Sequence, residues 1–124
     1  MLPEVEDAIP PNMKQTIEFT DNTFRTRYTG ETEKITGLRG VEGNDITDGL
    51  EFDLVKNKEG YLPGVLKPLD GGVPILFYPD GGVAATCVRG AYKLVYLAFY
   101  LNDIASVETK TLLLQKILDW FNKE

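Results

Sequence analysis

Histidine is absent from the 124-residue sequence, and cysteine and tryptophan each occur once. Without histidine, the chain has no Ser-His-Asp or Cys-His catalysis, no imidazole acid–base chemistry and no imidazole ligand for a metal. A single cysteine excludes an internal disulfide and a thiolate metal cage. The commonest routes to nucleophilic catalysis are therefore closed to this chain.

Positive charge is also scarce, because 13 Lys and Arg residues stand against 19 Asp and Glu residues, for a net charge of −6. Nucleic-acid binding depends on cationic side chains that face phosphates, so we expect no nucleic-acid partner. The sequence has no run of about 18 apolar residues and no basic-then-apolar start, so we expect neither membrane insertion nor a signal peptide. With 43% hydrophobic and 26% charged residues, the composition is that of an ordinary globular domain.

Residues 1–15 contain three prolines and no periodicity, which predicts an extended N-terminal arm before a single domain at 16–124. A β-hairpin is expected around Asp21-Asn22, with Thr23–Tyr28 as its second strand. Alternation of Leu50, Phe52 and Leu54 with polar residues predicts a half-buried strand, whereas the many glycines and prolines of residues 56–72 predict a loop.

The second half of the chain indicates a β-meander. Asp-Gly-Gly-Val occurs at 70–73 and at 80–83, and these two turns frame a strand that the prolines at its ends restrict to an edge or to first-residue positions. Val83–Val88 is the next predicted strand. Tyr92–Phe99 is apolar at both parities except for Lys93, so it is predicted to be the central strand, covered on both faces.

The chain ends in a predicted amphipathic helix with Ser106 as its N-cap. Its apolar stripe is Leu114, Ile117, Leu118 and Phe121, flanked by Leu113 and Trp120, and it predicts burial against more than one neighbour. The expected fold class is therefore α/β, with α+β as the alternative: a mixed sheet with a hairpin or meander, a buried central strand and a C-terminal helix.

The order of these segments resembles a known family. Ile75–Tyr78, then Asp-Gly-Gly-Val-Ala-Ala, then Tyr92–Phe99, then the C-terminal LLLQKILDWF together resemble the C-terminal half of class I glutamine-amidotransferase-like domains. The resemblance spans about residues 37–122 and implies a partial flavodoxin-like fold of the non-catalytic kind found in secreted and cell-surface bacterial proteins. The compartment stays open, because an unpaired cysteine also suits a reducing cytoplasm.

The chain departs from the catalytic members of that family. The half that carries the nucleophile has no counterpart here, and Cys87 lies inside a strand pattern. Tyr100 stands where the family's histidine is expected, and a phenol with an ordinary pKa of about 10 cannot replace that base near neutral pH. The resemblance therefore implies a protein that is not an enzyme and holds no cofactor.

Two groups of carboxylates are candidates for chemistry. Asn44, Asp48 and Glu51 are the candidate calcium ligands of an acidic segment, but Ile46 occupies the middle ligand position, which favours a solvated loop. Asp80 and Asp103 lie near predicted strand ends, where a ligand-binding or carboxylate-based hydrolase-like site would place them. Asp before Gly-Gly is also a common turn former.

Aromatic residues are the candidates for an interface: Tyr92, Tyr96 and Tyr100, which share one face of a strand, and Trp120 and Phe121 of the helix. A two-faced central strand with a single strong helix needs further cover from loops, from the arm or from another chain. We therefore expect a non-enzymatic structural or protein-interaction module, acting as a homodimer or as a subunit of a larger assembly. The alternatives are the ligand-binding or hydrolase-like domain, and an accessory subunit of a cofactor-bearing complex that holds no cofactor itself.

Overall fold

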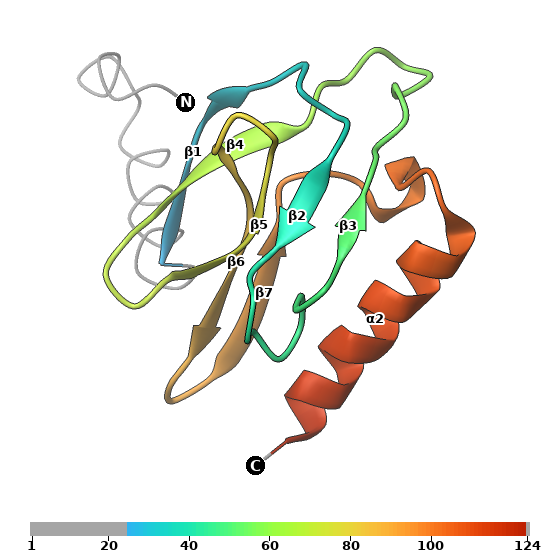
Figure 1. Cartoon of the computed structure of the whole chain (residues 1–124). Coiled ribbons are helices and arrows are strands. Elements are labelled where there is room, and N and C mark those ends of the chain that lie inside the picture. The colour runs from blue at the N-terminus through green and yellow to red at the C-terminus, as the bar shows by residue number, and fades with distance from the viewer. Residues whose placement is uncertain (1–24, 124) are drawn as a thin grey trace, which may run out of the picture.

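The computed structural model describes residues 25–123, which form a seven-stranded sheet with one long C-terminal helix (Figure 1). The sheet and helix confirm the predicted α/β or α+β fold class. The predicted arm at 1–15 and the turn at Asp21-Asn22 lie outside the described residues. The elements are β1 (Thr26–Glu31), β2 (Leu38–Gly40), β3 (Glu51–Phe52), β4 (Gly64–Pro68), β5 (Val73–Phe77), β6 (Val83–Arg89), β7 (Lys93–Leu97), a 3₁₀ turn (Leu101–Asp103) and α2 (Val107–Asn122).

The strands follow the order β1-β4-β6-β5-β2-β3, and β7 also pairs with β6. Every pairing among these seven strands is antiparallel. The connections between β5, β6 and β7 are tight turns, whereas parallel neighbours need crossovers of about a dozen residues or more. In this respect the sheet differs from the parallel sheet of a flavodoxin-like domain.

The central strand is β6, not β7. All five residues from Ala84 to Val88 are buried, and β6 has β5 along one edge and both β4 and β7 along the other. Among the described strands β7 pairs with β6 alone, and its residues are only half-buried. The prediction that Tyr92–Phe99 is central was wrong, because only one edge of β7 is paired within the described part of the chain.

The two faces of β6 are covered by different parts of the same chain. Cys87 belongs to the core cluster that includes Leu113 of α2. Its neighbour Thr86 points to the opposite face, where its Oγ1 lies 2.6 Å from Oγ1 of Thr26 in β1, and both threonines are buried. The ribbon of β1 and β4 therefore covers the face of β6 to which Thr86 points. The sequence offered no helix to cover this face.

Prolines and glycines misled the assignment of two strands. The segment expected to be a loop contains β4, whose ends are Gly64 and Pro68, so its three remaining residues were too few to give a pattern. The prolines were expected to restrict β5 to an edge or to first-residue positions; the strand lies between β6 and β2, and Pro74 is its second residue. Pro74 is tolerated there because β2 pairs with β5 at Leu76 and Phe77, beyond the proline.

Helix α2 begins as predicted, since Ser106 Oγ accepts a hydrogen bond from the Thr109 amide at 3.2 Å. Its buried residues are Leu113, Ile117 and Trp120, so Leu114, Leu118 and Phe121 of the predicted stripe face outward instead. The end of the helix is held from β7: Lys93 Nζ donates to the Trp120 carbonyl at 2.8 Å, and lies 5.5 Å from the centre of the Trp120 ring.

Candidate functional site

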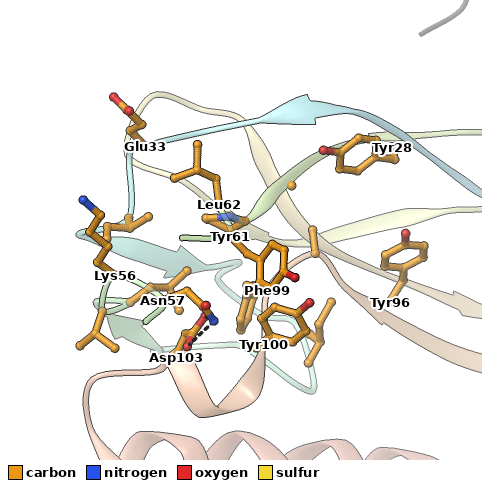
Figure 2. Close-up of a pocket in the computed structure, with 17 residues that line it drawn as sticks. Tyr28, Glu33, Lys56, Asn57, Tyr61, Leu62, Tyr96, Phe99, Tyr100 and Asp103 are labelled. Atoms are coloured by element: carbon orange, nitrogen blue, oxygen red, sulfur yellow. Dashed lines mark hydrogen bonds between the residues drawn. The ribbon is translucent and has the colours of Figure 1, made fainter. Parts of the chain in front are cut away.

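A pocket of about 510 Å³ lies between the start of β4, at Gly64, and the end of β7, at Tyr96 and Leu97 (Figure 2). Its volume is typical of small-molecule sites. Five aromatic side chains line it, together with residues of the segment between β3 and β4. They are Tyr28 of β1, Tyr61, Tyr96 of β7, Phe99 and Tyr100. We call this feature the tyrosine pocket.

Gly64 builds the floor of the tyrosine pocket. Its amide donates to the Ala98 carbonyl at 2.7 Å, and its carbonyl accepts from the buried Tyr78 hydroxyl at 2.6 Å. A Cβ atom at this position would lie 2.6 Å from Cε2 of Tyr28, so the tyrosine ring rests directly on the glycine backbone. The lack of a side chain at Gly64 therefore sets the position of the Tyr28 ring.

Tyr61 and Tyr100 form the rim. Their ring centres lie 6.5 Å apart in an edge-to-face arrangement, and the two residues are 58% and 59% exposed. Phe99, beside Tyr100, is buried and packs at 6.1 Å against Phe52 of the core. The rim is thus an exposed aromatic pair anchored to the core, an arrangement typical of binding surfaces.

The other end of the pocket is polar (Figure 2). Both carboxylate oxygens of Asp103 accept hydrogen bonds from Asn57 Nδ2, at 3.4 and 3.1 Å, and the Asp103 carbonyl accepts from the Val55 amide at 2.6 Å. Glu33 and Lys56 complete this end. Among residues 25–123, two carboxylates and one ammonium line the pocket and give this lining a net negative charge.

Three groups near the core have a perturbed pKa. Burial raises the pKa of Tyr28, and the charges of Glu31 and Tyr96 add to the effect. Burial, followed by Asp80, raises the pKa of Tyr78, and burial alone raises that of the Cys87 thiol. Each group is therefore neutral near pH 7, so none of them is an activated nucleophile or a base.

The structure separates the three tyrosines predicted to share a face. Tyr96 and Tyr100 both line the tyrosine pocket, whereas Tyr92 lies before β7 at the opposite end of the strand. Sequence reasoning missed Tyr28 and Tyr61, which come from β1 and from the segment expected to be a loop. No local pattern connects them to β7, because the long-range pairing of the strands brings them together.

Two of the candidate calcium ligands, Asn44 and Asp48, accept hydrogen bonds from backbone amides. Asn44 Oδ1 accepts from the amides of Ile46 and Thr47, at 2.9 and 3.1 Å, and Asp48 Oδ1 accepts from an amide at 3.1 Å. Glu51 is exposed in β3. Among residues 25–123 no three acidic or cysteine side chains lie together as metal ligands would.

The two carboxylates of the hydrolase-like alternative do not both line the tyrosine pocket. Asp103 lines the tyrosine pocket, and Asp80 does not. Asp80 Oδ1 accepts from the Gly82 amide at 3.0 Å and so closes the turn between β5 and β6.

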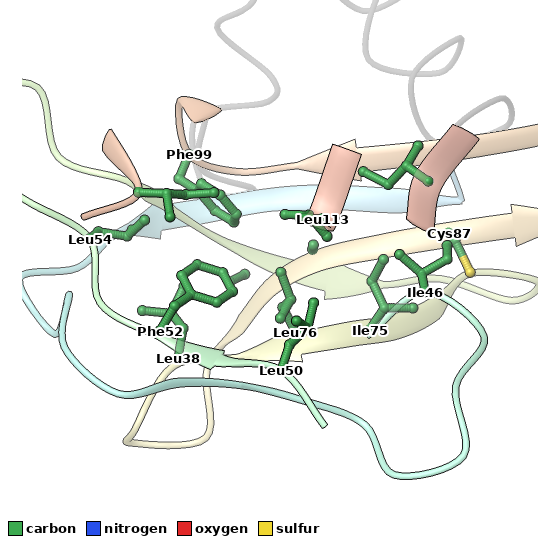
Figure 3. Packing of buried hydrophobic residues seen from close by; sticks show 14 of the residues in the cluster. Leu38, Ile46, Leu50, Phe52, Leu54, Ile75, Leu76, Cys87, Phe99 and Leu113 are labelled. Atoms are coloured by element: carbon green, nitrogen blue, oxygen red, sulfur yellow. The ribbon is translucent and has the colours of Figure 1, made fainter. Parts of the chain in front are cut away.

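Helix α2 carries a second candidate surface. Leu113 points into the core (Figure 3), but Val107, Leu114, Leu118 and Phe121 are 72%, 38%, 55% and 41% exposed. We call these four residues the apolar stripe. With Thr111 they repeat at alternating spacings of four and three residues, the pattern of a helix that packs against another helix. Trp120, an interface candidate from the sequence, is buried and packs against Phe121 at 5.4 Å.

Comparison with known proteins found no matching family model, no matching curated protein and no matching solved structure. The resemblance to an amidotransferase-like domain therefore stays a prediction. Within the described part of the chain, no helix combines the length and the apolar character needed to cross a bilayer.

Proposed function

We propose that the protein is a non-enzymatic interaction module that forms a homodimer through the apolar stripe of α2. The observation that carries the proposal is the exposure of four large apolar side chains along one side of a well-formed helix. Residues 25–123 leave this stripe uncovered, and contiguous apolar surface of this kind is typical of interaction sites.

A second copy fits the stripe better than an unrelated partner of mixed polarity. Its four-and-three spacing is self-complementary, so an antiparallel pair related by a two-fold axis sets Leu114 of one copy against Leu118 of the other. Beside the stripe lie Gln115 and Asn122, and Gln115 Nε2 donates to the Asp119 carboxylate at 2.9 Å.

The expected dimer is concentration-dependent. Helix α2 has 16 residues and so is about 24 Å long, which limits the area that a helix pair alone can bury. Interfaces of that extent lie at the low end of those that hold stable complexes. We therefore expect monomer and dimer to exchange within an accessible concentration range.

Sedimentation velocity of the full chain over a wide concentration range tests the proposal. The wild type is expected to dimerise, and Leu118→Lys is expected to be monomeric because it places an ammonium in the centre of the stripe. Leu112→Lys is the matched control, since Leu112 is similarly exposed but projects from the other side of the helix. A wild type that stays monomeric throughout, or equal effects of the two variants, would refute the helix interface.

A further inference from the structure

The tyrosine pocket shares no residue with the apolar stripe, and self-association through α2 leaves its function unassigned. From its aromatic lining and its charge, we infer that the pocket is a binding site for an organic cation, an ammonium group carried on a small apolar body.

The aromatic lining is the first argument. Tyr28, Tyr61, Tyr96 and Tyr100 come from three parts of the chain and line one cavity. The face of a tyrosine ring carries negative charge density, and a cation within about 6 Å of its centre is attracted to it. Such a contact changes affinity by a factor of about 2 at an exposed site and up to about 30 when water is excluded.

The charges around the pocket agree with this ligand. The Asp103 carboxylate is held in place at the wall by Asn57, and Glu33 supplies a second carboxylate. Lys56 is the one cation among the described residues of the lining; it lies at the outer edge, and its Nζ points away from the tyrosines (Figure 2). A positive ligand therefore gains from the local field, whereas a phosphate or carboxylate ligand is repelled.

The volume defines the rest of the ligand. A trimethylammonium head fills only part of about 510 Å³, and beside the polar end the lining also has an apolar part, with Leu54, Leu62 and Pro63 among its residues. A cation with an apolar body uses both the rings and this apolar part: the head lies against the rings and the body against the apolar part.

The test compares choline with its neutral isostere 3,3-dimethylbutan-1-ol by NMR titration of the ¹⁵N-labelled full chain. We expect choline to give saturable shifts at the amides of residues 96–100 and of Tyr61, and the neutral isostere to bind about 2- to 30-fold more weakly. Equal binding of the two compounds would show an apolar pocket without cation preference and would overturn the inference. The absence of saturable choline shifts would overturn it too. Methyl glucoside is titrated in parallel, and saturation by this sugar alone would indicate a carbohydrate site and also overturn the inference.

Two variants locate the effect. Tyr100→Leu and Tyr61→Leu remove exposed rings while keeping apolar bulk, so both are expected to fold and to lose most of the preference for choline. Tyr92→Leu is the control, because Tyr92 is also an exposed tyrosine but does not line the pocket. If Tyr92→Leu weakens choline binding as much as Tyr100→Leu does, the ligand lies elsewhere and the assignment of the site is wrong.

Discussion

Replacing Gly64 with alanine tests the architecture of the tyrosine pocket directly. The new Cβ would lie 2.6 Å from Cε2 and 2.9 Å from Cδ2 of Tyr28, closer than side-chain atoms approach one another. The glycine backbone cannot withdraw, because its amide and its carbonyl are both hydrogen-bonded, to Ala98 and to Tyr78. The Tyr28 ring must therefore leave its place on the floor.

The expected cost is the difference between two effects. Overpacking of this kind costs roughly 1–3 kcal/mol, whereas alanine in a strand regains roughly 0.5–1 kcal/mol of the entropy that glycine loses on folding. The net loss in the free energy of unfolding is then about 0.5–2 kcal/mol. For a chain of this size we expect the melting temperature to fall by roughly 2–8 °C in a thermal unfolding experiment followed by circular dichroism.

Gly90→Ala is the matched control, because its Cβ would have no atom within 4 Å and its φ is not positive. We expect that variant to change stability by no more than about 0.5 kcal/mol. A double-mutant cycle identifies the contact: in a Tyr28→Ala background the added methyl has space, so the cost of Gly64→Ala should largely disappear. An unchanged cost in that background would refute the packing of Tyr28 on Gly64.

Three further predictions concern the stability of the fold. Gly40→Ala places a Cβ 1.8 Å from the Thr47 carbonyl oxygen, so we expect no folded protein, and a dispersed NMR spectrum would contradict the packing there. Lys93→Met removes the hydrogen bond to Trp120 and is expected to cost about 1–3 kcal/mol in urea unfolding; a change below about 0.5 kcal/mol would mean that the helix end needs no partner. Since the pKa of Tyr78 is raised on folding, the unfolded phenol ionises first above about pH 10, and stability should fall with rising pH less steeply in Tyr78→Phe than in the wild type.

Local signals in the sequence predicted the parts of the fold that depend on neighbouring residues. Ser106 begins α2 because its hydroxyl accepts from the Thr109 amide, and this interaction spans three residues. The strand at Val83–Val88 was found for a similar reason, between two clear turns. The order of the strands in the sheet was not predictable in this way. Apolar residues on both faces of β7 do not reveal which of its edges is paired.

The residues of the tyrosine pocket also fall into two groups, those that the sequence identified and those that it did not. Spacing along the chain singled out Tyr96 and Tyr100, and both line the pocket. Tyr28 and Tyr61 lie more than 30 residues earlier, and only the pairing of β1 with β4 and of β4 with β6 brings them opposite β7. Tertiary contacts likewise determine which face of α2 packs on the sheet, since the residues of α2 offer two adjacent apolar faces.

The sequence and the structure point to different interfaces for a partner. From the sequence, an uncovered central strand needs cover from loops, from the N-terminal arm or from another chain, and cover by another chain would place Tyr96 and Tyr100 in the contact. In the structure the ribbon of β1 and β4 covers β6 through Thr26 and Thr86, so that need is met within the chain. A dimer through the apolar stripe places the contact on α2 and leaves the tyrosines accessible to a ligand. A choline titration at protein concentrations above and below the dimerisation midpoint distinguishes the two interfaces. A dimer formed through α2 must bind choline with the same affinity as the monomer. Loss of choline binding on dimerisation would favour the tyrosine face instead.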